Sequence, residues 1–287
     1  MPHAVTEEVR LSDGARLWTR SAPEAGRPAA VFVHGGPGMW DHLGPLAGML
    51  AGLAGTHRYD QRGCGRSAPD TDFRLDRFVA DLDELRAHFG HDRWFVVGHS
   101  FGATLGLAYA AARPERVAGL VYCSGVGLDW PGHRAAHRER ARARLTPAQR
   151  ARRDALQQRD RSWPEEVEWR TFCWLPDFAD PERRWELAAA DAATPLPLNR
   201  ECNRALNAET DARADAERTA CARVTAPVLA IHGAADPRPV AGVEALVDAL
   251  PSARLAVLDG AGHQPWRERP AATRALLREF VAAHTAP

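Results

Sequence analysis

The sequence predicts an α/β fold in which a mostly parallel central sheet carries helices on both faces and a helical cap is inserted between two strands. Three observations lead to this prediction. Short apolar runs that end in turn residues alternate with helical stretches along most of the chain. Unbroken apolar runs of this kind suit strands that are buried on both faces of a parallel sheet. One long stretch, 128–222, has no convincing strand run and interrupts the alternation.

The predicted strands begin with a hairpin near the N-terminus. Residues 4–12 and 15–22 alternate polar and apolar side chains around Asp13-Gly14, a typical turn pair. His57-Arg58-Tyr59 is a weaker strand candidate. The other strands are predicted from apolar runs at 30–33, 94–97, 117–122, 227–231 and 254–258. Strands that alternate with helices in this way favour a doubly wound layer.

The stretch 128–222 is rich in Arg, Ala, Glu and Trp, which predicts several helices. We expect it to form a cap inserted into a core domain made of 1–127 and 223–287. Within the cap, residues 134–161 carry ten arginines against three acids. A solvated helix face is the favoured interpretation of this charge, and a surface that docks an anionic partner is the alternative.

The composition excludes several classes of protein. The 37 basic and 37 acidic side chains give a formal net charge of zero, so nothing attracts the chain as a whole to nucleic acid or to a membrane. Every basic side chain is arginine, which rules out Schiff-base catalysis, a Ser-Lys dyad and a phosphate-binding loop lysine. The five cysteines are scattered and are expected to be free thiols. With neither a signal-peptide pattern nor a long apolar run, the protein is predicted to be cytoplasmic.

A nucleophilic serine is predicted at position 100. The run VVGHSFG, residues 96–102, joins an apolar strand to a helix-like stretch at 103–112. A serine between two such glycines can sit on a sharp strand-to-helix turn, which lifts its hydroxyl off the sheet. This context indicates that Ser100 is the catalytic nucleophile.

An acid and a base are predicted after the cap, because a serine needs a base and the base needs an orienting group. Asp236 follows the apolar run at 227–231, and His263 follows the last one, at 254–258. Both therefore belong to the rim formed by the carboxyl ends of the strands, in the expected order Ser, acid, His. The other histidines near strand ends are interpreted as packing or hydrogen-bonding residues: His34, His99 and His232.

The glycine-rich loop HGGPG, residues 34–38, is predicted to contribute to an oxyanion hole. Attack by serine creates an oxyanion that needs two backbone donors. One is expected to be the N–H of Phe101, directly after the nucleophile, and the other an N–H of this loop. Gly36 is the predicted second donor, because Pro37 has no N–H. Gly35 is expected to let the substrate approach the backbone closely.

Three segments together resemble the proline iminopeptidase family of α/β-hydrolases: HGGPG, DQRGCGRS at 60–67 and GHSFG at 98–102. The resemblance implies an α/β-hydrolase fold with a helical cap, and cleavage of an N-terminal residue, often proline, from a peptide or amide. The segment 60–67 is expected to brace the site, with Asp60 paired to Arg62. Cys64 is not favoured as a nucleophile.

The resemblance also implies that a cap carboxylate holds the α-ammonium group of the substrate. Such a site requires a carboxylate aimed at a desolvated cation. Glu201, in the segment NRECN at 199–203, is the first candidate, and Glu209 is the second. Three further cap acids remain open: Glu165, Glu166 and Glu168.

Two other functions remain open from the sequence. The family usually has glycine before its serine and tryptophan after it, whereas this chain has His99 and Phe101, as many esterases do. An esterase, lactonase or thioesterase acting on a small non-amine substrate is therefore the alternative, and a catalytically silent binding protein is the third. No cofactor is predicted, and no metal-binding pattern such as HExxH occurs. The expected partner is a small-molecule or short-peptide substrate.

Overall fold

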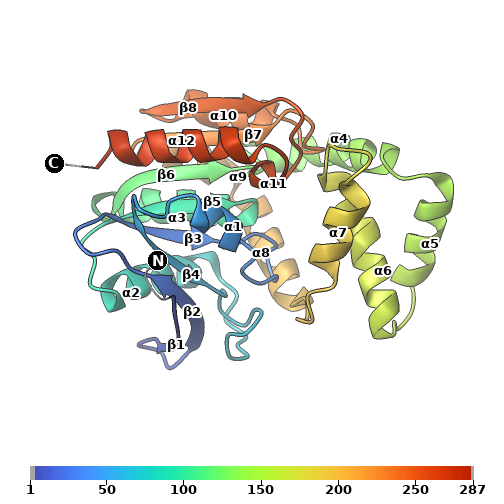
Figure 1. The fold of residues 1–287 in the computed structure, drawn as a ribbon, viewed down its shortest axis with the longest axis horizontal. Coiled ribbons are helices and arrows are strands. Elements are labelled where there is room, and N and C mark those ends of the chain that lie inside the picture. Colours follow the sequence, from blue (N-terminus) through green and yellow to red (C-terminus); the bar gives the residue numbers. More distant parts are fainter. Residues whose placement is uncertain (1–3, 286–287) are drawn as a thin grey trace.

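An eight-stranded sheet forms the centre of the protein in the computed structural model, which describes residues 4–285 (Figure 1). The strand order is β1-β2-β4-β3-β5-β6-β7-β8. β2 pairs antiparallel with β1 and β4, and the remaining neighbours pair in parallel. The strands are β1 Val5–Arg10, β2 Arg16–Ala22, β3 Ala29–Val33, β4 Gly55–Tyr59, β5 Trp94–His99, β6 Val117–Cys123, β7 Val228–Gly233 and β8 Ala253–Leu258.

Each predicted strand is present, and the predicted mostly parallel α/β layer is confirmed. The hairpin β1–β2 turns at Asp13-Gly14, where Gly14 has a φ of 93° that favours glycine. The weaker candidate at 57–59 belongs to β4, which lies inside the sheet between β2 and β3. Its His57 and Arg58 masked the strand signal in the sequence, although His57 is buried.

Two hydrophobic cores, one on each face, explain the unbroken apolar runs. Along β5, Val96 belongs to one core, and Phe95 and Val97 belong to the other. The first core packs against α2 (Leu75–His88) and α3 (Phe101–Ala112), and the second against α1 (Gly44–Gly48) and α12 (Pro270–Ala283). Alternate side chains of a strand point to opposite faces, so a strand with a core on both sides needs apolar residues throughout.

The helices of the sheet layer follow the strands in the expected alternation. They are α1 Gly44–Gly48, α2 Leu75–His88, α3 Phe101–Ala112, η1 Pro114–Arg116, α10 Ala241–Ala249, α11 Pro265–Glu268 and α12 Pro270–Ala283.

A helical segment connects β6 to β7 and contains no strand within the described residues. Its helices are α4 Trp130–Ala143, α5 Pro147–Gln157, α6 Trp163–Trp174, η2 Leu175–Asp177, α7 Arg184–Ala192, α8 Arg200–Ala212 and α9 Ala214–Cys221. In Figure 1 this segment extends to one side of the sheet, with α8 and α9 nearest to it. This matches the helices expected for 128–222, while the division into two domains stays a prediction.

The start of α8 is tied to two loops of the sheet layer. The Asn199 side chain caps the helix by accepting from the N–H of Cys202, and it donates to the carbonyl of Gly63 at 2.7 Å. Asn203 donates to the carbonyl of Pro37 at 2.8 Å. The segment is therefore anchored directly beside the glycine-rich loop.

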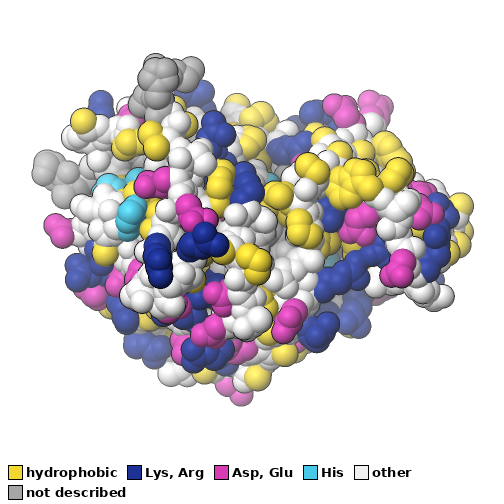
Figure 2. All heavy atoms as spheres, turned by 90° about the horizontal axis from the view of Figure 1, so that it is seen from below, with side chains coloured by type: hydrophobic (Ala, Val, Ile, Leu, Met, Phe, Trp, Pro, Cys, Tyr) yellow, Lys and Arg dark blue, Asp and Glu magenta, His cyan; other side chains and the backbone are white. Residues whose placement is uncertain are grey.

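The surface mixes charges of both signs. Figure 2 shows arginine and acidic side chains spread over one face, with hydrophobic side chains gathered over the helical segment. Trp163 and Trp185 are among the exposed apolar residues of that segment. None of the helices described between residues 4 and 285 is both long and apolar enough to cross a membrane.

Candidate active site

Ser100 occupies a tight turn between β5 and α3. Its backbone has φ 56° and ψ −123°, a conformation that costs a non-glycine residue free energy. A Cβ atom at Gly98 would lie 2.2 Å from the carbonyl oxygen of Gly102, and one at Gly102 would lie 2.0 Å from that of Val33. Only glycine fits at these two positions, which is the physical reason for the Gly-x-Ser-x-Gly pattern.

Asp236 and His263 meet at the carboxyl end of the sheet. Asp236 lies in the loop after β7 and His263 in the loop after β8, and both are buried. The Nδ1 atom of His263 is 2.6 Å from Oδ2 of Asp236. This contact fixes the imidazole ring with Nδ1 as the donor and leaves Nε2 free to accept a proton.

The charge on Asp236 is stabilised by two neighbours. Burial alone would raise the pKa of this carboxyl group, but the charges of His263 and Arg238 hold the pKa well below its usual value. The other carboxylate oxygen, Oδ1, accepts from the backbone N–H of Arg238 at 2.9 Å and from its guanidinium at 3.2 Å. Asp236 is therefore an anion near neutral pH.

Arg238 also connects this acid to the helical segment. Its guanidinium binds Oδ1 of Asp177, at the end of η2, at 2.7 Å. The backbone N–H of His263 donates to the carbonyl of Asp177 at 2.7 Å. One residue of the helical segment thus contacts the loops of both Asp236 and His263, so the position of that segment sets the position of the acid and base.

A chain of two further histidines supports His263 from the opposite side. A carbonyl can only accept, so His99 must donate from Nε2 to the carbonyl of His263, at 2.9 Å. The Nδ1 atom of His99 lies 3.1 Å from Nε2 of His42. Burial, with the charges of His263 and His42, lowers the pKa of His99 far below its usual value, so it is neutral. Its role here is to position the His263 loop.

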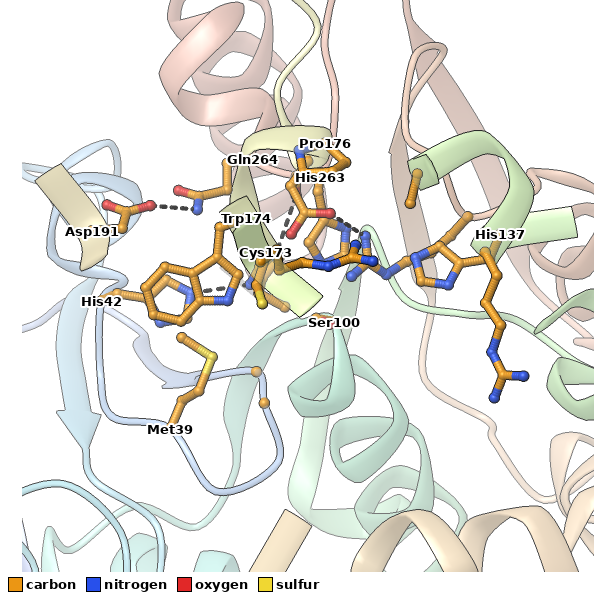
Figure 3. Close-up of a pocket in the computed structure, with 18 of the residues that line it drawn as sticks. Met39, His42, Ser100, His137, Cys173, Trp174, Pro176, Asp191, His263 and Gln264 are labelled. Atoms are coloured by element: carbon orange, nitrogen blue, oxygen red, sulfur yellow. Dashed lines mark hydrogen bonds and ion pairs between the residues drawn. The ribbon is translucent and has the colours of Figure 1, made fainter. Parts of the chain in front are cut away.

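A cavity of about 700 Å³ opens above Ser100 and is lined by His263. Figure 3 shows Ser100 at its floor, with His263 above it, His42 and Trp174 to one side and His137 to the other. Ser100 Oγ and His263 Nε2 form no hydrogen bond within residues 4–285. The three predicted catalytic residues nevertheless converge, and their roles in catalysis stay a prediction.

The loop at 34–38 lies against Ser100. A Cβ atom at Gly35 would be 2.8 Å from the Cβ of Ser100, so the close approach requires glycine. Gly36 has φ 132°, which also favours glycine. The His34 ring braces the loop by bonding the carbonyl of Gly35 at 2.8 Å and accepting from the N–H of Gln61 at 3.0 Å.

The two predicted oxyanion donors lie beside the serine. Phe101 is the first residue of α3, so its N–H has no acceptor within the helix. The N–H of Gly36 donates to no group in the described part of the chain. Gly36 and Phe101 line a second cavity together with Ser100, of about 120 Å³. The arrangement is compatible with an oxyanion hole, which stays a prediction.

The structure does not support the predicted amine-binding role of Glu201 or Glu209. Glu201 is exposed on α8 and lines neither cavity at Ser100. Glu209 accepts from the backbone N–H of Leu75 at 2.7 Å, at the start of α2, and pairs with Arg213. Neither carboxylate lines a cavity at Ser100, since α8 turns Glu201 to solvent and Glu209 to the sheet layer.

The three other cap acids are neutralised by arginines. Glu165, Glu166 and Glu168 pair with Arg159, Arg161 and Arg152, respectively. None of the three lines the cavities at Ser100.

The expected pair of Asp60 and Arg62 is wrong. Asp60 binds Arg66 instead, at 2.6 Å, and Arg62 binds Asp81 at 2.6 Å and Asp70 at 2.8 Å. The Arg62 side chain reaches Asp81 on α2, a contact that the spacing of charges in the sequence did not reveal. Cys64 is buried, and its contact with Cys202, together with burial, raises the pKa of its thiol well above the usual value. It is therefore a poor nucleophile.

Two carboxylates that the sequence did not single out line the smaller cavity: Asp211, which pairs with Arg134, and Glu217, which has no such partner in the described part of the chain. Glu217 of α9 lines the cavity with Ser100, Phe101 and Thr104. It is partly buried, and its side chain forms no ion pair or hydrogen bond within residues 4–285. Burial raises its pKa to about 7. The sequence of the short polar helix 214–221 has no pattern that distinguishes Glu217 from an acid exposed to solvent.

Replacement of Glu217 by glutamine should change how stability depends on pH. The folded-state pKa of about 7 lies above the ordinary 4.5, so the folded protein binds more protons in this interval and loses stability as the pH rises through it. Glu217→Gln should therefore be more stable than the unmodified protein by about 1–3 kcal/mol at pH 8 and nearly equal at pH 4. Urea unfolding at both values, with exposed Glu201→Gln as control, measures this. An equal difference at both pH values would contradict it.

No group of three or more potential metal ligands occurs among the described residues.

Comparison with known proteins identifies relatives of the same architecture. A family model described as the alpha/beta hydrolase fold matches residues 28–266. A solved proline iminopeptidase-related protein from Thermus thermophilus superposes with a TM-score of 0.74 over 98% of both chains, at 22% identity. The predicted α/β-hydrolase fold is thus confirmed.

Two curated relatives carry the name expected from the motifs. A probable proline iminopeptidase of Leptolyngbya boryana is 36% identical over 119 residues, which are 36% of this chain and 33% of that protein. The proline iminopeptidase of Neisseria gonorrhoeae is 39% identical over 132 residues, or 41% of this chain and 38% of that protein. The matched stretches span only about a third of each relative, and they confirm the predicted resemblance.

Proposed function

Because this chain belongs to the α/β-hydrolase fold family, we propose that it is a serine hydrolase that removes an N-terminal aminoacyl group, such as prolyl or alanyl, from a short peptide or small amide. One observation carries the proposal. Ser100, on its strained turn, and His263, which is hydrogen-bonded to the buried Asp236, line the same cavity. The helical segment 128–222 acts as the cap over this cavity.

The reaction proceeds by two acyl transfers. Oγ of Ser100 attacks the carbonyl carbon of the substrate while its proton passes to Nε2 of His263. That proton then goes to the leaving nitrogen as the C–N bond breaks, which leaves the acyl group on Ser100. Water, deprotonated by His263, attacks the acyl-enzyme, releases the amino acid and restores the serine. Asp236 stabilises the imidazolium in both steps.

The oxyanion of each tetrahedral intermediate binds the N–H groups of Gly36 and Phe101. Both line the smaller cavity, which His263 does not line. Since His263 delivers a proton to the leaving group, that group occupies the larger cavity and the acyl group occupies the smaller one. A cavity of about 120 Å³ suits a small aminoacyl group.

Glu217 is the carboxylate that binds the α-ammonium group of the acyl part. It lines the small cavity beside Ser100 and has no internal partner in residues 4–285. A desolvated carboxylate gains most from a cation that shares its cavity. This residue therefore takes the role that the sequence analysis gave to Glu201.

An esterase remains the second candidate, and one observation favours it. Every carboxylate that lines the larger cavity is already engaged: Asp154 by Arg153, Asp177 by Arg238 and Asp191 by Arg267. The larger cavity therefore offers no free carboxylate to bind an ammonium group, so a substrate that is recognised by this cavity alone needs no amine.

Matched substrates separate the two functions. Alanine anilide and proline anilide should be turned over, and N-acetyl-alanine anilide should be nearly inert, because acetylation removes the ammonium group. Glu217→Gln should lower kcat/KM for the free-amine anilides by about one to two orders of magnitude and leave a small acyl ester less affected. Glu201→Gln, on the exposed side of α8, serves as the control and should change neither. Preference for the ester and the N-acetyl substrate would favour the esterase.

A further inference from the structure

The larger cavity has more positive than negative charge on its walls. Four arginines line it, Arg138, Arg142, Arg153 and Arg238, together with three aspartates. Two of the arginines, Arg153 and Arg238, pair with two of the aspartates, and Asp191 binds Arg267 from outside the lining. Arg138 and Arg142 therefore have no counter-charge in the cavity.

The histidines that line the cavity add no negative charge, because an imidazole ring is either neutral or cationic. Burial, with the charge of Arg238, lowers the pKa of His137 to about 4, so this ring is neutral. Burial also raises the pKa of the Cys173 thiol to about 12, so it carries no charge either. The excess of positive charge thus remains.

Arg138 and Arg142 share one face of α4. They are four residues apart, a spacing that places two helical side chains next to each other. Within residues 4–285 neither guanidinium donates a hydrogen bond or forms an ion pair. Among the arginines of 134–161, all except Arg138, Arg140 and Arg142 donate side-chain hydrogen bonds to carboxylates or carbonyls.

The two unpaired guanidinium groups are thus distinguished from most of the arginine-rich surface. All three unpaired arginines are exposed, but Arg140 does not line the cavity, whereas Arg138 and Arg142 do. A guanidinium group binds a carboxylate with two parallel hydrogen bonds, and two adjacent groups attract an anion to the cavity before it binds. The chemistry of this wall therefore favours a carboxylate.

We propose that Arg138 and Arg142 form an anion subsite that holds a carboxylate on the leaving group of the substrate. The inference rests on the proposed function, which puts the leaving group in the cavity lined by His263. With Glu217 in the smaller cavity, the substrate is a short zwitterion: a free amine on the acyl side and a free carboxylate on the leaving side. A free dipeptide has this chemistry, whereas a long peptide or a C-terminal amide does not present it there.

The test compares alanyl-phenylalanine with its C-terminal amide, two substrates that differ only in the carboxylate. The unmodified protein should prefer the acid by about tenfold or more in kcat/KM. The double variant Arg138→Gln/Arg142→Gln should lose this preference. Arg140→Gln, a matched exposed arginine on the same helix, should retain it. The double variant Arg138→Lys/Arg142→Lys should keep part of the preference, because the charge is preserved and the fork geometry is not.

The outcomes distinguish the subsite from the function it depends on. Turnover of both substrates at equal kcat/KM by the unmodified protein would overturn the anion subsite and leave the aminoacyl hydrolase intact. The anion subsite would also be overturned if the Arg138→Gln/Arg142→Gln variant still preferred the acid over the amide. Turnover of neither substrate would overturn both proposals. Circular dichroism and the Tm of each variant establish that the exposed substitutions leave the fold unchanged.

Discussion

Ser100→Ala should abolish nearly all activity while leaving the protein folded. The expected loss in kcat is about five to six orders of magnitude, since a catalytic serine and its base act as a unit. The substitution keeps the Cβ atom, so the strain at φ 56° is unchanged, and Oγ has no hydrogen bond to lose within residues 4–285. The Tm should therefore stay close to that of the unmodified protein. Steady-state kinetics with alanine anilide and thermal unfolding measure the two effects.

Ser124→Ala is the matched control for this prediction. Ser124 also has a positive φ, 48°, and lies buried at the end of the neighbouring strand β6. It does not line the cavity, so its replacement should leave kcat within a few-fold. A fluorophosphonate probe followed by mass spectrometry should label Ser100. A label on Cys64, or full activity in Ser100→Ala, would show that the nucleophile is another residue.

Asp236→Asn should lower kcat by about 10⁴-fold with the fold preserved. An asparagine amide can donate to Nδ1 of His263, which favours the ring tautomer with the proton on Nε2. That tautomer cannot accept the proton of Ser100. The effect should appear in kcat far more than in KM, because the acid touches the base and not the substrate. A pH–rate profile and steady-state kinetics measure it.

Asp177→Asn separates this tautomer effect from the loss of charge around Arg238. Asp177 and Asp236 bind the same guanidinium, but only Asp236 contacts the imidazole. The backbone carbonyl of Asp177, which accepts from His263, is unchanged in the variant. We expect a loss of about tenfold or less. Similar losses in both variants would mean that Asp236 acts through Arg238 and that another carboxylate orients the base.

Most of the sheet and the convergence of Ser100, Asp236 and His263 could be predicted from the sequence, because the signals for both are local. A strand with a core on each face must be apolar throughout, as β5 is, and this leaves an unbroken run. The turn at Ser100 requires glycine at 98 and 102 for contacts made within a few residues and with the adjacent strand β3. Residues that follow parallel strands share one rim whatever the loops do.

The partners of charged side chains could not be predicted in the same way. Arg62 was expected to bind Asp60 and instead binds Asp81, which comes from α2. Arg238 was not recognised at all, because its partner Asp177 lies 61 residues away in the chain. An arginine side chain is long and can reach several acids, so packing between elements decides which one it meets.

The sequence by itself determined the fold, the strained serine turn and the placing of acid and base after their strands. Only the tertiary structure decided which cap residues face the cavities at Ser100. Successive residues of a helix are rotated by about 100° around its axis. A cap acid therefore faces solvent, as Glu201 does, or a cavity, as Glu217 does, according to how its helix packs on the sheet layer. That packing depends on contacts between distant segments, such as Asn203 with Pro37, which no local pattern records.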